Sequence, residues 1–303
     1  MAARKRASGK KRERKLWLIT AAVLLPVIVF INFGDLADDF QDVWIQRRLP
    51  DPSVMRVTMI DVGQGDSIWL TSGGESVLVD AGENYYGSHV ARYLKRNGVK
   101  SLAAVIGTHP HSDHIGGIDN VLDAMPVDTL YMPDADSGMA FFSDVMDAAA
   151  DAYVDVVIPE AGQQIRVGDM EITFLHPDAG DVFEDLNNYS ICILVEHPYG
   201  SIILTGDAES DAELRMLDTG LIKDVDVLKV GHHGSVSSTS DPFLAAISPE
   251  FALISCGAGN DYGHPHRETL GKLSDGNINV FRTDRDGAIA VDFTEGGITI
   301  TTG

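Results

Sequence analysis

Three histidines and one aspartate fall within six consecutive positions, and no other feature limits the possible folds of this chain as strongly. They are His109, His111, Asp113 and His114, and they follow the apolar run at residues 102–106, which predicts a buried strand. Three imidazoles at one strand end are typical of a metal site, which needs a fold that gathers loops at one edge of a sheet. A solvated polar loop is the alternative, and the density of histidine argues against it.

The pattern around this cluster is one of short β-branched runs alternating with helical stretches. Strands are predicted at residues 54–60, 67–70, 76–79, 102–106, 164–167, 170–175, 191–195, 201–204, 225–230, 251–255, 279–281, 288–293 and 298–301. Helices are predicted at 88–97, 118–124 and 208–217, with another that begins at Asp241. Both halves bring histidines to strand ends. We therefore expect an α/β fold in which two sheets pack together with helices outside and the site in the crevice at the strand ends.

The first cluster can hold two metal ions only with help from elsewhere in the chain. His109 and His111, at a spacing of two, can bind one ion, while Asp113 and His114 turn toward a second. Zinc binds imidazole nitrogens and carboxylate oxygens, and manganese accepts the same donors, so either metal fits this set.

Further ligands are available at strand ends in the second half of the chain. Asp207 could bridge the two ions, although a carboxylate before a helix is also a common cap. One of His232 and His233 could complete the second ion site, and their order is open. We expect two divalent ions, zinc or manganese.

The first 53 residues differ in character from the rest. Residues 1–15 contain eight Lys or Arg and one Glu, a net charge of +7. Because the whole chain has a formal net charge of −22, the remaining residues carry −29. Residues 16–33 have no charged side chain and would span roughly 27 Å as a helix. We expect a cytoplasmic tail at 1–15, a single membrane anchor at 16–33, a linker at 34–53 and an extracytoplasmic domain at 54–303. A cleaved signal peptide and a buried soluble helix are the alternatives.

The acidic excess beyond residue 33 argues against general attraction to polyanions such as nucleic acids. A polyanionic substrate would have to be bound by a local site. Lys229, Arg282 and Arg285 are candidates for local positive charge in such a site.

Seven ordered motifs resemble the C-terminal hydrolase domain of ComEC/Rec2-like competence proteins, within the metallo-β-lactamase fold superfamily. Beside the HxHxDH pattern at His109–His114, they lie at residues 61–67, 79–82, 187–190, 204–207, 228–235, 262–266 and 282–284. The resemblance covers roughly residues 55–302. It implies an αβ/βα sandwich and a metal-dependent phosphodiesterase, which in the competence proteins is a DNase.

The resemblance also implies a role for each matching residue. The residues that match the metal ligands are His109, His111, Asp113, His114, Asp207 and His232. As catalytic groups, Asp113 or Asp207 would orient the attacking hydroxide, and His233 would lie next to the metals as a proton donor or phosphate contact. Asp80 matches a buried acid that supports the ligand loop, and Asp61 and Asp66 belong to a turn beneath the metals. Asn188, Ser235, His264 and His266 are candidate contacts for phosphate or substrate.

Two departures from the wider superfamily bear on function. Where many relatives have a third histidine for the first ion, this chain has Asn187 and Asn188. An amide is a poorer zinc ligand than imidazole, which favours manganese and argues against β-lactam hydrolysis. The competence proteins also have a polytopic channel domain, whereas one apolar span is found here, so a partner channel protein is left open.

Three functions are compatible with these observations. A membrane-anchored nuclease is the leading hypothesis. A phosphodiesterase on another substrate, such as phosphorylcholine on wall polymers, suits the acidic charge balance. A binding protein without catalytic activity is the third.

Overall fold

The computed structural model describes residues 51–135, 137–178 and 180–303. The tail and anchor expected before residue 34, and residues 34–50 of the linker expected at 34–53, lie outside the described residues. In the part that is described, no helix has both the length and the apolar composition needed to cross a membrane.

The strands form two mixed sheets. The first has the order β15-β14-β1-β2-β3-β4-β5-β6 and the second β13-β12-β11-β10-β9-β8-β7. The bounds in the first sheet are β1 Met55–Met59, β2 Ile68–Ser72, β3 Glu75–Val79, β4 Ala104–Ile106, β5 Thr129–Tyr131, β6 Asp155–Val157, β14 Ile289–Thr294 and β15 Gly297–Thr302. Those in the second are β7 Gln164–Val167, β8 Met170–His176, β9 Cys192–His197, β10 Gly200–Leu204, β11 Val227–Lys229, β12 Phe251–Ile254 and β13 Asn279–Arg282.

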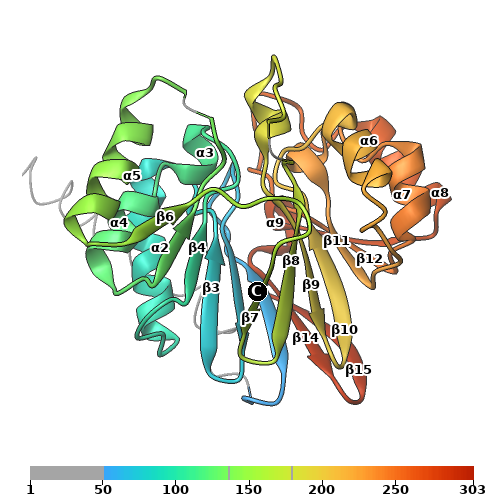
Figure 1. Cartoon of the computed structure of the whole chain (residues 1–303). Coiled ribbons are helices and arrows are strands. Elements are labelled where there is room, and N and C mark those ends of the chain that lie inside the picture. Colours follow the sequence, from blue (N-terminus) through green and yellow to red (C-terminus); the bar gives the residue numbers. More distant parts are fainter. Residues whose placement is uncertain (1–50, 136, 179) are drawn as a thin grey trace, which may run out of the picture. The chain divides into compact units, whose positions relative to one another are not determined.

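Helices cover the outer face of each sheet (Figure 1). Beside the first sheet lie α2 Asn84–Arg96, α3 Ser112–Ile115, α4 Ile118–Ala124 and α5 Ala140–Asp151. With the second sheet lie α6 Ser210–Asp218, α7 Asp241–Ile247, α8 Arg267–Asp275 and α9 Thr283–Asp286. Two 3-10 turns, η1 Leu186–Tyr189 and η2 Gly231–Gly234, complete the described elements.

Three apolar layers hold this arrangement together. Met59 and Val79 of the first sheet pack with Phe174 and Ile193 of the second in one buried cluster between the sheets. A second cluster lies under α2, α4 and α5, and a third under α6, α7 and α8. Because each sheet is apolar on both faces, the described residues form the expected αβ/βα sandwich.

The predicted elements agree with the structure where the apolar pattern is strong. Helix α4 and strand β7 have the predicted bounds, and most other strands differ by one or two residues. The sequence prediction lacks β5, β6, α3, α5, α8 and α9. The two strands have three residues each, and the mostly polar α8 has only Thr269 and Leu273 buried, so neither type of element has a strong periodic signal.

The parallel strands determine where the site lies. β3, β4 and β5 run parallel in the first sheet, and β10, β11 and β12 do so in the second. Parallel strands end at the same edge, so the loops after them meet there. Asp80, the 108–114 loop, Asp207 and the 231–235 turn all follow such strands.

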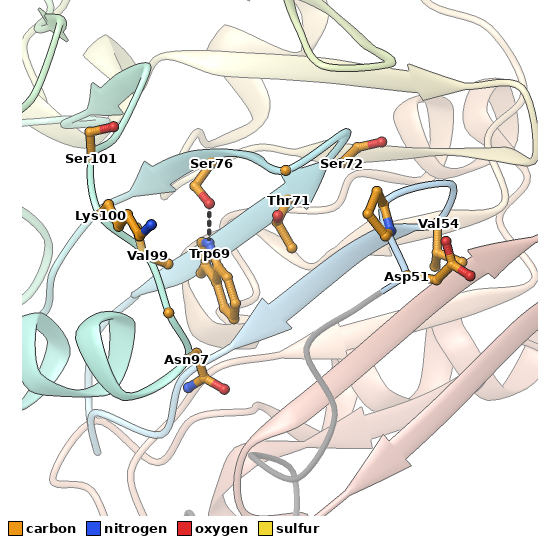
Figure 2. Close-up of a pocket in the computed structure, with 13 residues that line it drawn as sticks. Asp51, Val54, Trp69, Thr71, Ser72, Ser76, Asn97, Val99, Lys100 and Ser101 are labelled. Atoms are coloured by element: carbon orange, nitrogen blue, oxygen red, sulfur yellow. Dashed lines mark hydrogen bonds between the residues drawn. The ribbon is translucent and has the colours of Figure 1, made fainter.

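A cavity of about 530 Å³ lies at the opposite end of β2 and β3, near the turn that joins them (Figure 2). Trp69 lines it and donates a hydrogen bond from Nε1 to Ser76 Oγ at 3.1 Å. None of its lining residues belongs to the histidine and aspartate groups described below, so it is a separate feature of the fold.

Candidate metal centre

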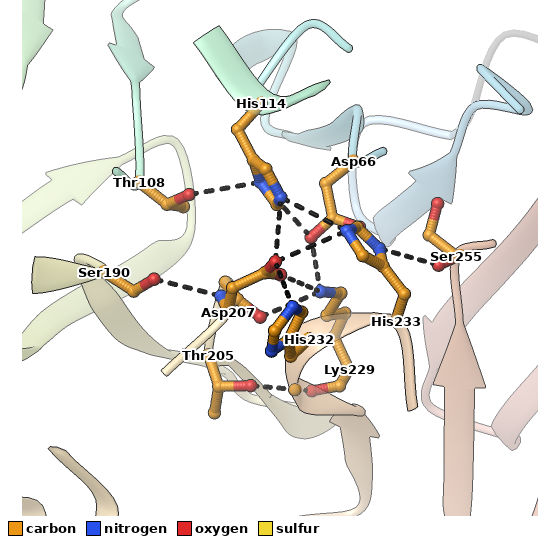
Figure 3. Close-up of polar contacts among 12 residues, drawn as sticks. Asp66, Thr108, His114, Ser190, Thr205, Asp207, Lys229, His232, His233 and Ser255 are labelled. Atoms are coloured by element: carbon orange, nitrogen blue, oxygen red, sulfur yellow. Dashed lines mark hydrogen bonds and ion pairs between the residues drawn. The ribbon is translucent and has the colours of Figure 1, made fainter. Parts of the chain in front are cut away.

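Two histidines, in segments that follow strands of different sheets, point Nε2 at one another and at Asp207 (Figure 3). Nε2 of His114 lies 3.3 Å from Nε2 of His233 and 3.3 Å from Asp207 Oδ2. His233 Nε2 is 3.4 Å from Asp207 Oδ2 and 3.4 Å from Asp113 Oδ2. Four candidate metal-binding atoms thus lie close together, two of them from each half of the chain.

The other ring nitrogen, Nδ1, of each of these two histidines has a hydrogen-bond partner on the side away from the cluster. His114 Nδ1 lies 2.8 Å from Asp80 Oδ2, and His233 Nδ1 donates to the backbone oxygen of Ser255 at 2.9 Å. With a proton on Nδ1, Nε2 keeps its lone pair for a metal. The structure therefore sets the tautomer that a metal site at Nε2 needs.

Asp80 joins two strand ends as well as orienting His114. Its Oδ1 accepts a hydrogen bond from Thr108 N at 2.8 Å, and its Oδ2 accepts one from Thr108 Oγ1 at 2.7 Å. Its backbone is left-handed, with φ 57°, a conformation that is uncommon outside glycine. Burial raises the pKa of Asp80 despite the opposing effect of His114.

Asp66 also belongs to this group of residues but lies on the Nδ1 side. Carboxylate or ring atoms of Asp66, His114, Asp207 and His233 all lie within 4.8 Å of one another. Asp66 Oδ1 is 3.5 Å from His233 Nδ1, and its other oxygen forms an ion pair with the buried Lys229. For an ion at the Nε2 atoms we therefore favour Asp113 over Asp66 as the ligand, with Asp66 as support.

The charges of this cluster stabilise one another. Burial disfavours the charged form of His233, but Asp207, Asp113 and Asp66 outweigh it and raise its pKa to about 9. Burial likewise disfavours the Asp66 carboxylate, but the Lys229 ammonium lowers its pKa to about 2. The anionic charge of the aspartates is therefore maintained at neutral pH, as a divalent cation requires.

Unpaired buried oxygens test whether a metal fits. Within the described residues, Asp66 Oδ1 and Asp207 Oδ1 are buried and have no hydrogen-bond partner. Leaving such atoms unpaired is costly, and in this part of the chain Asp207 Oδ1 has only the Lys229 ammonium nearby, at 3.9 Å, while its Oδ2 faces the histidines. The donor set of imidazoles and carboxylates is also the one that zinc and manganese bind. The residues present therefore fit a divalent metal.

His109 and His111 form a second imidazole pair beside the first. His109 Nε2 lies 3.0 Å from His111 Nδ1, and the rings of His109 and His114 are 4.2 Å apart. His109 Nδ1 contacts Ser190 Oγ at 3.3 Å on its far side. Burial, together with the charge on His114, holds the pKa of His109 well below its usual range, so it is neutral and able to bind a metal.

The two histidines of the 231–234 turn differ in placement. His233 is buried in the cluster, whereas His232 is partly exposed, with Nε2 3.6 Å from Asp207 Oδ2 and Nδ1 3.4 Å from Glu209 Oε1. Both have left-handed backbones, with φ 47° and 52°. The sequence motif predicts His232 as the metal ligand and leaves open whether His232 or His233 takes that role. The contacts with Asp113 and Asp207 favour His233.

Asp113, Asp207 and His233 of the cluster line a cleft of about 470 Å³. His264 lines it, whereas Ser235 bonds to Ser237 Oγ at 2.9 Å and His266 Nδ1 accepts from Val236 N, both within the adjoining loop. Asn188 is the predicted substrate contact, but the neighbouring Asn187 lines the cleft instead. Its Oδ1 is buried without a hydrogen-bond partner among the described residues.

Asn188 and Asp61 instead support the backbone. Asn188 Oδ1 accepts from Glu209 N at 3.1 Å, and the exposed Asp61 accepts from Gly63 N at 3.0 Å in the turn before Asp66. Of the cations considered from sequence, Lys229 is buried against Asp66 and Arg282 is paired with Asp284 at 2.6 Å.

The sequence of the chain is similar to those of known proteins. The family model described as "Metallo-beta-lactamase superfamily" matches residues 60–258. The chain is 34% identical over 251 residues to ComE operon protein 3 of Bacillus subtilis, covering 77% of this chain and 32% of that protein. It is 30% identical over 252 residues to Recombination protein 2 of Haemophilus influenzae, covering 82% of this chain and 30% of that protein. The chain thus spans about a third of the length of these relatives.

A solved structure also shares the fold. The metallo-beta-lactamase fold protein YhfI of Bacillus subtilis superposes with a TM-score of 0.52 at 17% identity, over 76% of this chain and 96% of that one.

Proposed function

The chain belongs to the metallo-beta-lactamase superfamily and is related to the competence proteins, and from this membership we propose that it is a metal-dependent phosphodiesterase that acts as a nuclease. The observation that carries the proposal is the close approach of His114, His233, Asp113 and Asp207, the last three of which line an open cleft. The name of one relative, Recombination protein 2, refers to recombination, which supports DNA as the substrate.

The candidate ligands fall into two groups, one for each ion. His114, His233, Asp113 and Asp207 would hold one divalent ion, and His109 and His111 would hold a second with Asp207. When bound, such ions supply Lewis acidity and lower the pKa of water toward 7.

Asp113 and other residues of the cleft would orient the attacking water and bind the substrate. Asp113, with 24% of its side chain exposed, faces the cleft and would accept the hydrogen bond of the attacking water. Burial and the neighbouring His232 and His233 lower the pKa of His264 to about 4, so it is a neutral hydrogen-bonding group for phosphate. The unpaired Oδ1 of Asn187 belongs to an amide whose NH2 group would donate to a phosphoryl oxygen.

The test is cleavage of DNA by the purified full chain with manganese or zinc. The double variant His111→Ala with Asp207→Ala is expected to lose at least one ion per chain and to fall to the background rate, because both ion sites lose a ligand. The matched control is His197→Ala with Asp128→Ala, two positions outside the cleft, and it should retain metal and activity. An active His111/Asp207 variant would rule the proposal out.

A second candidate is a phosphodiesterase that acts on a non-nucleic substrate such as phosphorylcholine on wall polymers. It is favoured by the net charge of −22 and by a cleft in which no described lining residue is Lys or Arg. Turnover of p-nitrophenyl phosphorylcholine with no cleavage of single-stranded DNA would select it. Metal content below one ion per chain, with no hydrolysis of any phosphodiester, would instead indicate a binding protein.

The location of the protein is proposed from sequence alone. A single-pass anchor at residues 16–33 would hold the catalytic domain outside the cytoplasm, where a channel protein could be its partner. Protease added to intact cells should then digest the domain, whereas a protected domain would contradict this topology.

A further inference from the structure

Tyr262 is a large aromatic side chain held at the mouth of the metal-lined cleft. It lies in the loop between β12 and α8, lines the cleft, and is 67% exposed. One face of its ring is stacked on His264, with centroids 5.6 Å apart and an interplanar angle of 21°. An exposed tyrosine that is fixed in one orientation offers flat apolar area at little entropic cost.

The stack leads from Tyr262 toward the candidate metal ligands. The His264 ring lies 5.3 Å from that of His232 and 6.1 Å from that of His233. His233 in turn contacts Asp207 and Asp113. A molecule whose phosphate lies at the ligands could therefore also reach the Tyr262 ring.

Hydrogen bonds hold this loop in place. Asn260 Nδ2 donates to His264 O at 2.7 Å, and His264 N donates to Asn260 Oδ1 at 3.0 Å. His266 N donates to Gly234 O, which ties the loop to the turn that carries His233. The stacking surface is therefore built before any ligand binds, which reduces the cost of binding.

The charge around the cleft makes stacking more important. No Lys or Arg lines the cleft among the residues the structure describes, and Lys229 is buried behind the ligands in an ion pair with Asp66. Contacts between cations and phosphates, which dominate most nucleic-acid binding, are thus missing from its walls. Base stacking on an aromatic ring contributes to binding without any charge.

We propose that Tyr262 is a specificity-determining residue that stacks on a nucleobase next to the scissile phosphodiester and thereby selects single-stranded over duplex substrate. Bases within a duplex are already stacked on their neighbours and must be displaced before they can contact the ring. The inference rests on the nuclease function proposed above.

The test compares Tyr262→Ala and Tyr262→Trp in the full chain with metal bound. On single-stranded oligonucleotides, kcat/KM of Tyr262→Ala should fall about 5- to 150-fold, which corresponds to the loss of one stacked base. Tyr262→Trp should keep the wild-type rate, and its fluorescence should be quenched by the oligonucleotide. Tyr153→Ala is the control, since Tyr153 is 95% exposed and lies outside the cleft.

Substrates that lack one base identify the contact. A set of single strands would each carry one abasic position, at a different place in each strand. The wild type should cleave one of these strands more slowly than the others, by the same factor by which Tyr262→Ala lowers kcat/KM. The variant should show no further loss there, because both changes remove the same interaction. If the wild type cleaves single strands and Tyr262→Ala is as fast, the stacking proposal is overturned and the nuclease assignment stands. If the wild type cleaves no nucleic acid, both are overturned.

Discussion

At the scale of single residues, the candidate metal centre depends on what lies behind each histidine. His114 and His233 present Nε2 to the cluster because Asp80 and the Ser255 carbonyl occupy their Nδ1 atoms. Three residues at this site, Asp80, His232 and His233, have left-handed backbones. Such a conformation costs about 1–2 kcal/mol per residue, and the surrounding contacts must compensate for it.

Asp80→Asn tests the orienting role of this carboxylate. Asparagine has nearly the same shape and tolerates a left-handed backbone, but it replaces one accepting oxygen with an NH2 group, so either Thr108 N or His114 Nδ1 loses its acceptor together with the charge. We expect metal affinity to fall about 10- to 100-fold in a calorimetric titration with manganese or zinc. The control is Asp123→Asn on the exposed side of α4. Equal affinities of the two variants would show that Asp80 does not tune the site.

At the scale of elements, one buried ion pair connects the two sheets beneath the site. Lys229 belongs to β11 of the second sheet, and Asp66 lies in the loop between β1 and β2 of the first. Lys229 Nζ also donates to Gly206 O at 3.0 Å, next to Asp207. The loop is also close to the first ligand cluster, since Asp66 N donates to Asp113 O at 3.1 Å. Lys229 therefore positions loops from both halves of the site.

Lys229→Met should destabilise the protein strongly, because it leaves Asp66 as an uncompensated buried charge. We expect a loss of about 3–5 kcal/mol in the free energy of unfolding, measured by denaturant titration. Adding Asp66→Asn should restore part of this loss, since the unpaired charge disappears.

The exposed pair Lys223–Glu196 provides the comparison for this prediction. Lys223→Met should cost at most about 1 kcal/mol, because half-exposed ion pairs contribute little. Similar losses for Lys223→Met and Lys229→Met would contradict a special role for the buried pair.

At the scale of the whole domain, metal binding and folding should be coupled. The candidate ligands come from loops of both sheets, so an ion would connect the two halves in addition to the apolar layer between them. An ion that binds only the folded state stabilises it by about 2.7 kcal/mol at a concentration 100 times its Kd.

The metal effect should increase with pH. The pKa of His233 is raised from 6.5 to about 9, so in the metal-free protein its protonated form adds stability that is complete below pH 6.5 and lost as pH rises toward 9. An ion needs the neutral imidazole and competes with this proton. The increase in Tm caused by manganese over a chelator should therefore be larger at pH 9 than at pH 6.5. An increase that is the same at both pH values would contradict proton competition at His233.

Much of the fold and part of the candidate site could be predicted from sequence because their signals are local. Runs such as 164–167 and 118–124 have the periodicity of their element within a few residues. The spacing of His109, His111, Asp113 and His114 after a strand likewise indicates a metal site without knowledge of the rest. Short elements such as β5 and β6 were missed because three residues do not establish a period.

By itself, the sequence determined the class of fold, the type of metal-binding residue and the strand ends from which those residues come. Only the tertiary structure decided that His233 rather than His232 turns into the cluster, that Asn187 rather than Asn188 lines the cleft, and that Lys229 is paired with Asp66. The physical reason is that adjacent residues in a tight turn point in different directions. Which of them meets a side chain more than a hundred positions away depends on how the two sheets pack.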